Sequence, residues 1–222
     1  LTGSMNCCPG ISIPLRQSHY RKPPEMSPVV PLKQPKPKKI PDLLQLRIEL
    51  AWIKPKIWRR IVVPESITLG HLHHVLQMAF GWGDCHLHEF EIDGERFGIP
   101  DPEFDWEPIR SEKRIQLKTA LGGLLSFKYI YDFGDHWEHR IKVEKTLLGD
   151  PELANRAIYL GGANAAPPDD VGGAPGYENF VAAMVDPKHP EHQQMLEWYG
   201  GSFDPTCFDA IALSLAYHDI KI

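Results

Sequence analysis

Apolar and polar residues alternate along five short stretches of the chain, and this period of two predicts strands with one covered face. The stretches are residues 43–50, 57–63, 86–92, 127–131 and 137–143. The last two flank a short turn in which Gly134 can supply a positive φ, so we expect an antiparallel hairpin there.

A spacing of three and four residues predicts helices elsewhere. The first runs from Leu69 to Phe80, with Thr68 as its N-cap and Gly81 as its stop. Three more are expected at residues 177–185, 190–199 and 206–217. Strands first and helices last predict an α+β fold, in which a mainly antiparallel sheet has helices packed on one side. We expect residues 42–222 to form it as a single domain.

Composition changes sharply near residue 41. Residues 1–41 are rich in proline and carry seven basic residues against Glu25, a net charge of +6. Residues 42–222 therefore carry −11 within the chain's total of −5. We expect residues 1–41 to be a disordered Pro/Lys-rich tail, and residues 1–4, before Met5, are read as a cloning remnant. An acidic domain repels phosphate backbones, so nucleic acid could bind only through the tail.

Cysteine usage and hydropathy predict a cytoplasmic protein. The four cysteines form no CxxC pair and no disulfide framework; they are Cys7, Cys8, Cys85 and Cys207. No apolar run approaches the roughly 20 residues that span a bilayer, so no membrane partner is expected.

Titratable side chains are densest around the predicted hairpin turn. More carboxylates lie in the proline loop, defined here as residues 161–176, whose glycine and proline content predicts irregular structure. If this loop folds back on the hairpin, the two groups form one acidic and aromatic surface that recognises a protein or ligand. The simpler alternative is turn formation and core packing. The candidate residues are Asp132, Asp135, His136, Trp137, Glu138, Asp169 and Asp170.

Three histidines suggest a different role. His86 and His88 lie two apart on a predicted strand, so both side chains should leave the same face. His73, on the preceding helix, and a carboxylate from Asp132 or Asp135 could complete a site for a divalent transition metal with an open position. The alternative is that these histidines only hydrogen-bond their neighbours in the core.

Five motifs, in this order along the chain, resemble one known family. They read LGHLHHVLQMAFGW, HLHEF, YDFGDHWEH, PPDDVGGAPGYENF and DPKHPEHQQMLEWYGGSFDP. The chain resembles the plasmid pRiA open-reading-frame-three-like family over about residues 43–209. Members are often labelled TnpR-type passenger proteins of insertion elements, which implies an accessory protein of mobile elements. Relatives often carry cysteines where this chain has Tyr159, Leu160 and Ala166, which disfavours a thiolate metal site here.

The TnpR label suggests a recombinase, but the residues do not support one. The N-terminus offers no serine-nucleophile domain, and the string His136-Trp137-Glu138-His139 has histidine where an HxxR element needs arginine. We therefore expect a non-catalytic binding or interaction module with an unknown partner. A metal-dependent hydrolase using the histidine cluster is the alternative, and DNA binding or recombination ranks third.

Overall fold

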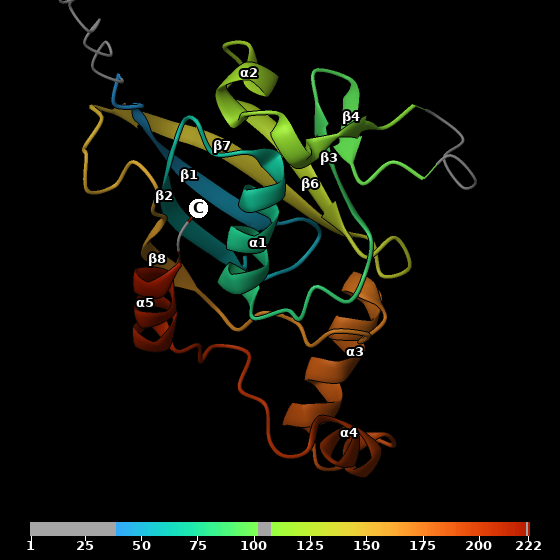
Figure 1. The fold of residues 1–222 in the computed structure, drawn as a ribbon. Helices are drawn as coiled ribbons and strands as arrows, with labels where there is room; N and C mark the ends of the chain where they lie inside the picture. The colour runs from blue at the N-terminus through green and yellow to red at the C-terminus, as the bar shows by residue number, and fades with distance from the viewer. Residues whose placement is uncertain (1–38, 102–107, 221) are drawn as a thin grey trace, which may run out of the picture. The chain divides into compact units, whose positions relative to one another are not determined.

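The structure is a computed structural model that describes residues 39–101, 108–220 and 222. Residues 39–222 form one compact unit (Figure 1). The expected disordered tail lies outside the described residues, apart from residues 39–41. None of the helices in the described ranges is long and apolar enough to span a bilayer.

The described residues form an eight-stranded sheet with the order β5-β4-β3-β6-β7-β1-β2-β8. All neighbouring strands are antiparallel except β4 and β5, so the expected mainly antiparallel α+β fold is confirmed. The strands are β1 (Leu43–Leu50), β2 (Trp58–Pro64), β3 (His88–Ile92), β4 (Glu95–Gly98), β5 (Arg110–Ser111), β6 (Ser126–Tyr131), β7 (Trp137–Leu147) and β8 (Ile158–Ala163).

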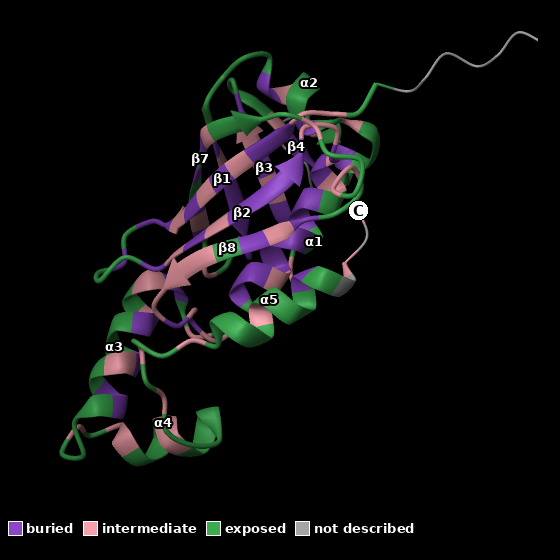
Figure 2. Cartoon of the chain, turned by 90° about the vertical axis from the view of Figure 1, so that its left-hand side faces the viewer, coloured by how far each residue is buried: buried purple, intermediate pink, exposed green. Residues whose placement is uncertain are grey.

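Helices cover one face of this sheet, with α1 and α5 lying against it (Figures 1 and 2). Helices α3 and α4 pack on each other beyond the end of the sheet that carries the β6–β7 turn. The α-helices are α1 (Leu69–Phe80), α2 (Leu117–Leu121), α3 (Gly173–Val185), α4 (His192–Tyr199) and α5 (Ala210–Asp219), and a 3-10 helix spans Glu112–Arg114.

The alternation in β1 produces two unlike faces. Leu46 and Ile48 are fully buried against the helices, whereas Arg47 and Glu49 point to the uncovered face and pair with each other. Apolar burial of this kind contributes about 1.5–3 kcal/mol for each large side chain. The core therefore lies between the sheet and α1, as the alternation predicts.

Helix α1 begins and ends where its sequence indicates. The Thr68 side chain accepts a hydrogen bond from the His71 amide, and Gly81 takes a left-handed φ of 71°. The apolar stripe of the helix, including Leu72 and Val75, is fully buried. The helix is thus held rigidly on the sheet, which fixes the direction of its polar side chains.

Three local expectations are wrong. Gly161 and Gly162 lie in β8, because their backbones pair with Arg60 and Arg59 of β2. The last helix starts at Ala210, since the Asp209 side chain accepts from the Ala212 amide and caps it there.

The third concerns the hairpin turn. The positive φ values fall on Asp132 (53°) and His136 (54°), and Gly134 is not among the residues with positive φ. Aspartate and histidine tolerate this left-handed conformation better than most residues do. The left-handed conformations that reverse the chain therefore lie at the two ends of the turn, at Asp132 and His136.

Candidate functional site

The β6–β7 turn and the proline loop are in direct contact. The Gly172 amide donates to Asp135 Oδ2 at 3.0 Å. Gly173 lies so close that a Cβ there would be 2.4 Å from the Asp135 carbonyl oxygen, and its φ is +66°. Only glycine fits that position without displacement. The loop therefore folds back on the hairpin.

This contact assembles the His86 cluster, which we define as His86, Asp132 and Asp170. His86 Nε2 lies 3.2 Å from Asp170 Oδ1 and 3.8 Å from Asp132 Oδ2. One ligand atom from each of the three residues lies within 4.8 Å of the others. His86 Nε2 is enclosed and makes no well-aligned hydrogen bond. An enclosed nitrogen facing two carboxylates is the arrangement that a cation would complete.

Asp169 borders this cluster. Its Oδ2 accepts a hydrogen bond from the Gly83 amide at 3.3 Å. Burial raises the pKa of the Asp169 carboxyl, and the nearby charges of Asp170 and Asp132 add to that increase. Four carboxylates thus gather at one end of the sheet: Asp132, Asp135, Asp169 and Asp170.

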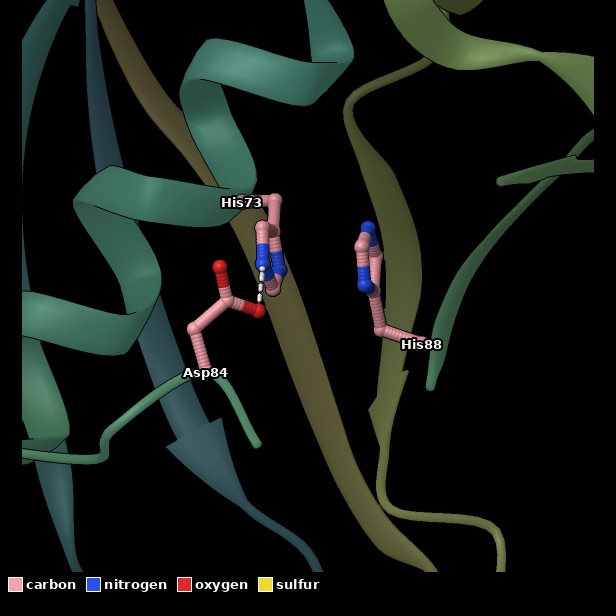
Figure 3. Close-up of side chains that lie close together, drawn as sticks. All are labelled: His73, Asp84 and His88. Carbon is pink, nitrogen blue, oxygen red and sulfur yellow. Dashed lines mark hydrogen bonds and ion pairs between the residues drawn. The ribbon is translucent and has the colours of Figure 1, made fainter. Parts of the chain in front are cut away.

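A second polar group surrounds His73, inside the domain (Figure 3). His73 Nε2 lies 2.7 Å from Asp84 Oδ1, and its Nδ1 lies 2.7 Å from the Tyr129 hydroxyl. Gln77 closes the ring, because its amide nitrogen donates to Tyr129 and its oxygen accepts from the Asp84 backbone. Burial first, and then His88, lower the pKa of His73 to about 4. A neutral His73 that donates from Nε2 and accepts at Nδ1 satisfies every member of the ring.

The rings of His73 and His88 are stacked, with centroids 3.5 Å apart and planes 5° apart. His88 Nε2 is also engaged, at 2.9 Å from Glu112 Oε2. Imidazole lone pairs lie in the ring plane, so two parallel stacked rings cannot both aim at one ion without turning. Although these histidines and Asp84 are close enough to hold a metal, their present bonds and orientation oppose it.

The expected grouping of His73, His86 and His88 around one ion is therefore not what the structure shows. His86 precedes β3, which begins at His88, so the alternation of a strand does not extend to it. His88 faces α1, whereas His86 turns toward Asp132 and Asp170.

The side chains of three other candidates lie away from the His86 cluster. Trp137 is 2% exposed and stacks with Trp82 in the core. Glu138 follows it on β7, points to the opposite face and pairs with Arg140. His136 is exposed and contributes its backbone to the turn. Of the seven candidate residues, the structure brings the four aspartates together and places these three side chains elsewhere.

Sequence reasoning missed Asp84 and Glu112, the carboxylates that bind His73 and His88. Both lie in segments with no periodicity, so no pattern directs them inward. The one available signal is that a histidine on a buried helix face needs a polar partner.

Comparison of this chain with known proteins shows which family it belongs to. The chain is 40% identical over 185 residues to the uncharacterized protein y4hQ of Sinorhizobium fredii (strain NBRC 101917 / NGR234), covering 82% of this chain and 93% of that protein. It is similar to the crystal structure of a protein of unknown function, MM3350, from Methanosarcina mazei Go1. That match has a TM-score of 0.68 and 35% identity, covering 77% of this chain and 97% of the other. Residues 42–212 match the plasmid pRiA4b ORF-3-like protein family, and the chain belongs to that family.

Proposed function

We propose that this protein is a binding module that holds a divalent transition-metal ion at the His86 cluster and uses it to recognise a partner. The observation that carries the proposal is the enclosed Nε2 of His86, which makes no well-aligned hydrogen bond but lies within ion-pair distance of the carboxylates of Asp132 and Asp170.

The spacing of these atoms supports an ion. Two ligand atoms that are each roughly 2.0–2.2 Å from one metal lie about 2.8–3.6 Å apart at tetrahedral or octahedral angles. The distance of 3.2 Å between His86 Nε2 and Asp170 Oδ1 falls in that range, and 3.8 Å to Asp132 Oδ2 needs only a small side-chain shift. One imidazole with two carboxylates suits Zn²⁺ or Mn²⁺.

The exposure of the cluster supports recognition. The Asp170 side chain is 72% exposed, whereas that of Asp132 is 11% exposed. An ion held on the inner side by Asp132 would therefore keep coordination positions open toward solvent. A carboxylate or carbonyl oxygen of a partner could fill them, which makes the bound ion part of the interface.

Hydrolysis at the same ion is a second candidate, and Asp169 favours it. Asp169 lies beside the cluster, held by the Gly83 amide, and its carboxylate could act there as a general base toward a water on the ion. Recombination and DNA binding, which the TnpR label suggests, have no support from this acidic site.

Calorimetric titration of chelator-treated protein with Zn²⁺ and Mn²⁺ tests the proposal. We expect one equivalent to bind, binding to be lost in His86→Ala, and binding to persist in His71→Ala, which removes an exposed histidine of α1. Absence of binding by the wild type, or equal binding by both variants, would contradict it.

The two roles of the ion are separated by Asp169→Asn. If the protein is a hydrolase, metal-loaded wild type cleaves a phosphoester or amide substrate and the variant binds the ion but loses turnover. If it is a binding module, neither protein turns over any substrate and both bind the ion.

A further inference from the structure

Arg59 of β2 is a buried cation that points toward the helices. It is 2% exposed. Its Nε donates to the Ala79 carbonyl at 2.8 Å, and its Nη1 donates to the carbonyls of Trp58 and Ala163 at 2.9 and 3.1 Å. The guanidinium also lies over the ring of Phe208, with 4.4 Å to the centroid. The side chain is thus held firmly by neutral groups.

No carboxylate in the described part of the chain pairs with Arg59. Burial lowers its pKa, and only the phenols of Tyr159 and Tyr217 oppose that shift. Its Nη2 has no hydrogen-bond acceptor among the described residues, yet it is not one of the fully enclosed polar atoms. Buried charges are normally paired, because an unpaired ion costs several kcal/mol. An anion that reaches Nη2 would supply the charged partner that Arg59 lacks among the described residues.

Arg59 lines a cleft of about 800 Å³ between α1, α5 and the proline loop. Aromatic rings form much of the wall, and they include Phe80, Trp82, Phe203 and Phe208. This size is within the range of small-molecule sites, which combine an apolar lining with a few fixed polar groups. The cleft can therefore enclose a flat apolar body next to a single charge.

Three carboxylates also line the cleft, and each already accepts a hydrogen bond from the protein. Asp169 accepts from Gly83, Asp204 from Thr206 and Asp209 from Ala212. Their negative charges oppose every anion, and they oppose a multiply charged one such as a nucleotide or inorganic phosphate most strongly, because the repulsion grows with the charge of the ligand. The cleft should therefore select a monoanion.

We propose that this cleft binds an aromatic monocarboxylate, whose carboxylate pairs with Arg59 and whose ring packs against the aromatic wall. This site is separate from the His86 cluster, although Asp169 borders both, and its ligand contacts need no cation. Chelator-treated and dialysed protein should bind the ligand as well as metal-loaded protein does, so each proposal can fail without the other.

Calorimetry with indole-3-acetate, its neutral analogue indole-3-acetamide, and inorganic phosphate tests the inference. We expect the carboxylate to bind at least about tenfold more tightly than the amide, because a charge-assisted bond to Arg59 contributes about 1.5–3 kcal/mol. Phosphate should bind more weakly than the carboxylate. Equal affinity for acid and amide, tighter binding of phosphate, or no binding at about 10 mM ligand would overturn the proposal.

Two variants test whether the ligand binds in this cleft. Arg59→Met keeps most of the side-chain volume and should remove the preference for the acid. Ala212→Trp, at an exposed position that lines the cleft, should block binding without touching Arg59, and it covers the case in which Arg59→Met does not fold. Leu215→Trp is the control, an exposed α5 residue that does not line the cleft. Undiminished binding by Ala212→Trp would place the ligand elsewhere and overturn the proposal.

Discussion

His73 and His88 lie face to face in the core, with their ring centroids 3.5 Å apart. Each ring is tied to its own carboxylate, His73 to Asp84 and His88 to Glu112. The ring contact joins α1 to β3, and the two carboxylates tie the pair to the segment after α1 and to the 3-10 helix. The stability of the pair depends on the imidazole of His73 being neutral, since burial, and then the neighbouring His88, lower the pKa of His73 and disfavour the charged ring.

Acidification should therefore destabilise the domain. The folded pKa of His73 is about 4, below its ordinary value of 6.5, so the unfolded chain binds more protons between these pH values. The contribution of His73 to the free energy of unfolding is fully present above pH 6.5. It is lost as the pH falls toward 4, and the loss amounts to roughly 3 kcal/mol. Urea unfolding at pH 7, 5.5 and 4.5 measures the loss. His73→Gln should show a shallower dependence, and an unchanged slope would assign the effect to other groups.

Removing the Tyr129 hydroxyl should open the hydrogen-bonded ring. In Tyr129→Phe, His73 Nδ1 and the Gln77 amide both lose a buried partner, which costs about 1–3 kcal/mol for each unsatisfied group. Tyr177→Phe is the matched control, because that buried tyrosine has no hydroxyl partner among the described residues and should change stability by less than about 0.5 kcal/mol. Chemical denaturation of both variants tests this, and equal losses would show that the ring contributes nothing specific.

The contact between the proline loop and the hairpin should be sensitive to a single methyl group. Gly173→Ala places a Cβ against the Asp135 carbonyl on a residue whose backbone is left-handed. We expect the free energy of unfolding to fall by at least about 1–3 kcal/mol. At Gly200 the φ is also positive, but no atom lies within 4 Å of an added Cβ. Gly200→Ala should therefore lower the free energy of unfolding by about 1 kcal/mol. Gly161→Ala has neither feature and should be nearly neutral. Thermal unfolding ranks the three variants, and a Gly173→Ala protein as stable as Gly161→Ala would contradict the contact.

Gly173→Ala also links stability to the proposed ion. Displacing the loop moves Asp170 away from His86, so cation affinity should fall more than tenfold although no ligand is changed. Isothermal titration with Zn²⁺ measures this. Gly200→Ala, whose strain is far from the cluster along the chain, should keep wild-type affinity. Equal affinity in the two variants would mean that the loop position does not matter.

A bound cation should raise thermal stability with the logarithm of its concentration above the dissociation constant. At 100 times the dissociation constant, an ion that binds only the folded state stabilises it by about 2.7 kcal/mol. The rise should disappear in Asp132→Asn, because Asp132 supplies the buried carboxylate of the cluster. Differential scanning fluorimetry with increasing Mn²⁺ measures it. A rise of the same size in Asp132→Asn would place the ion at another site.

Local pattern alone determined most of the architecture. The alternation in β1 and the capped stripe of α1 predict their elements correctly, because the side-chain periods of strands and helices are properties of the backbone. The same reasoning fails for β8, whose glycines form a strand only because β2 offers them paired hydrogen bonds.

The candidate site depends on tertiary structure for a different reason. The sequence places Asp132 in a turn and Asp170 in an irregular loop, where no period predicts a direction, and it places His86 on a strand that in the structure begins only at His88. Their meeting depends on the close approach of Gly173 to Asp135, a contact between residues 38 positions apart. Likewise, the side chains of His86 and His88 point in different directions, because the pairing of β3 with β6 starts at His88. Where a strand begins is decided by its neighbour, and that neighbour is far away along the chain.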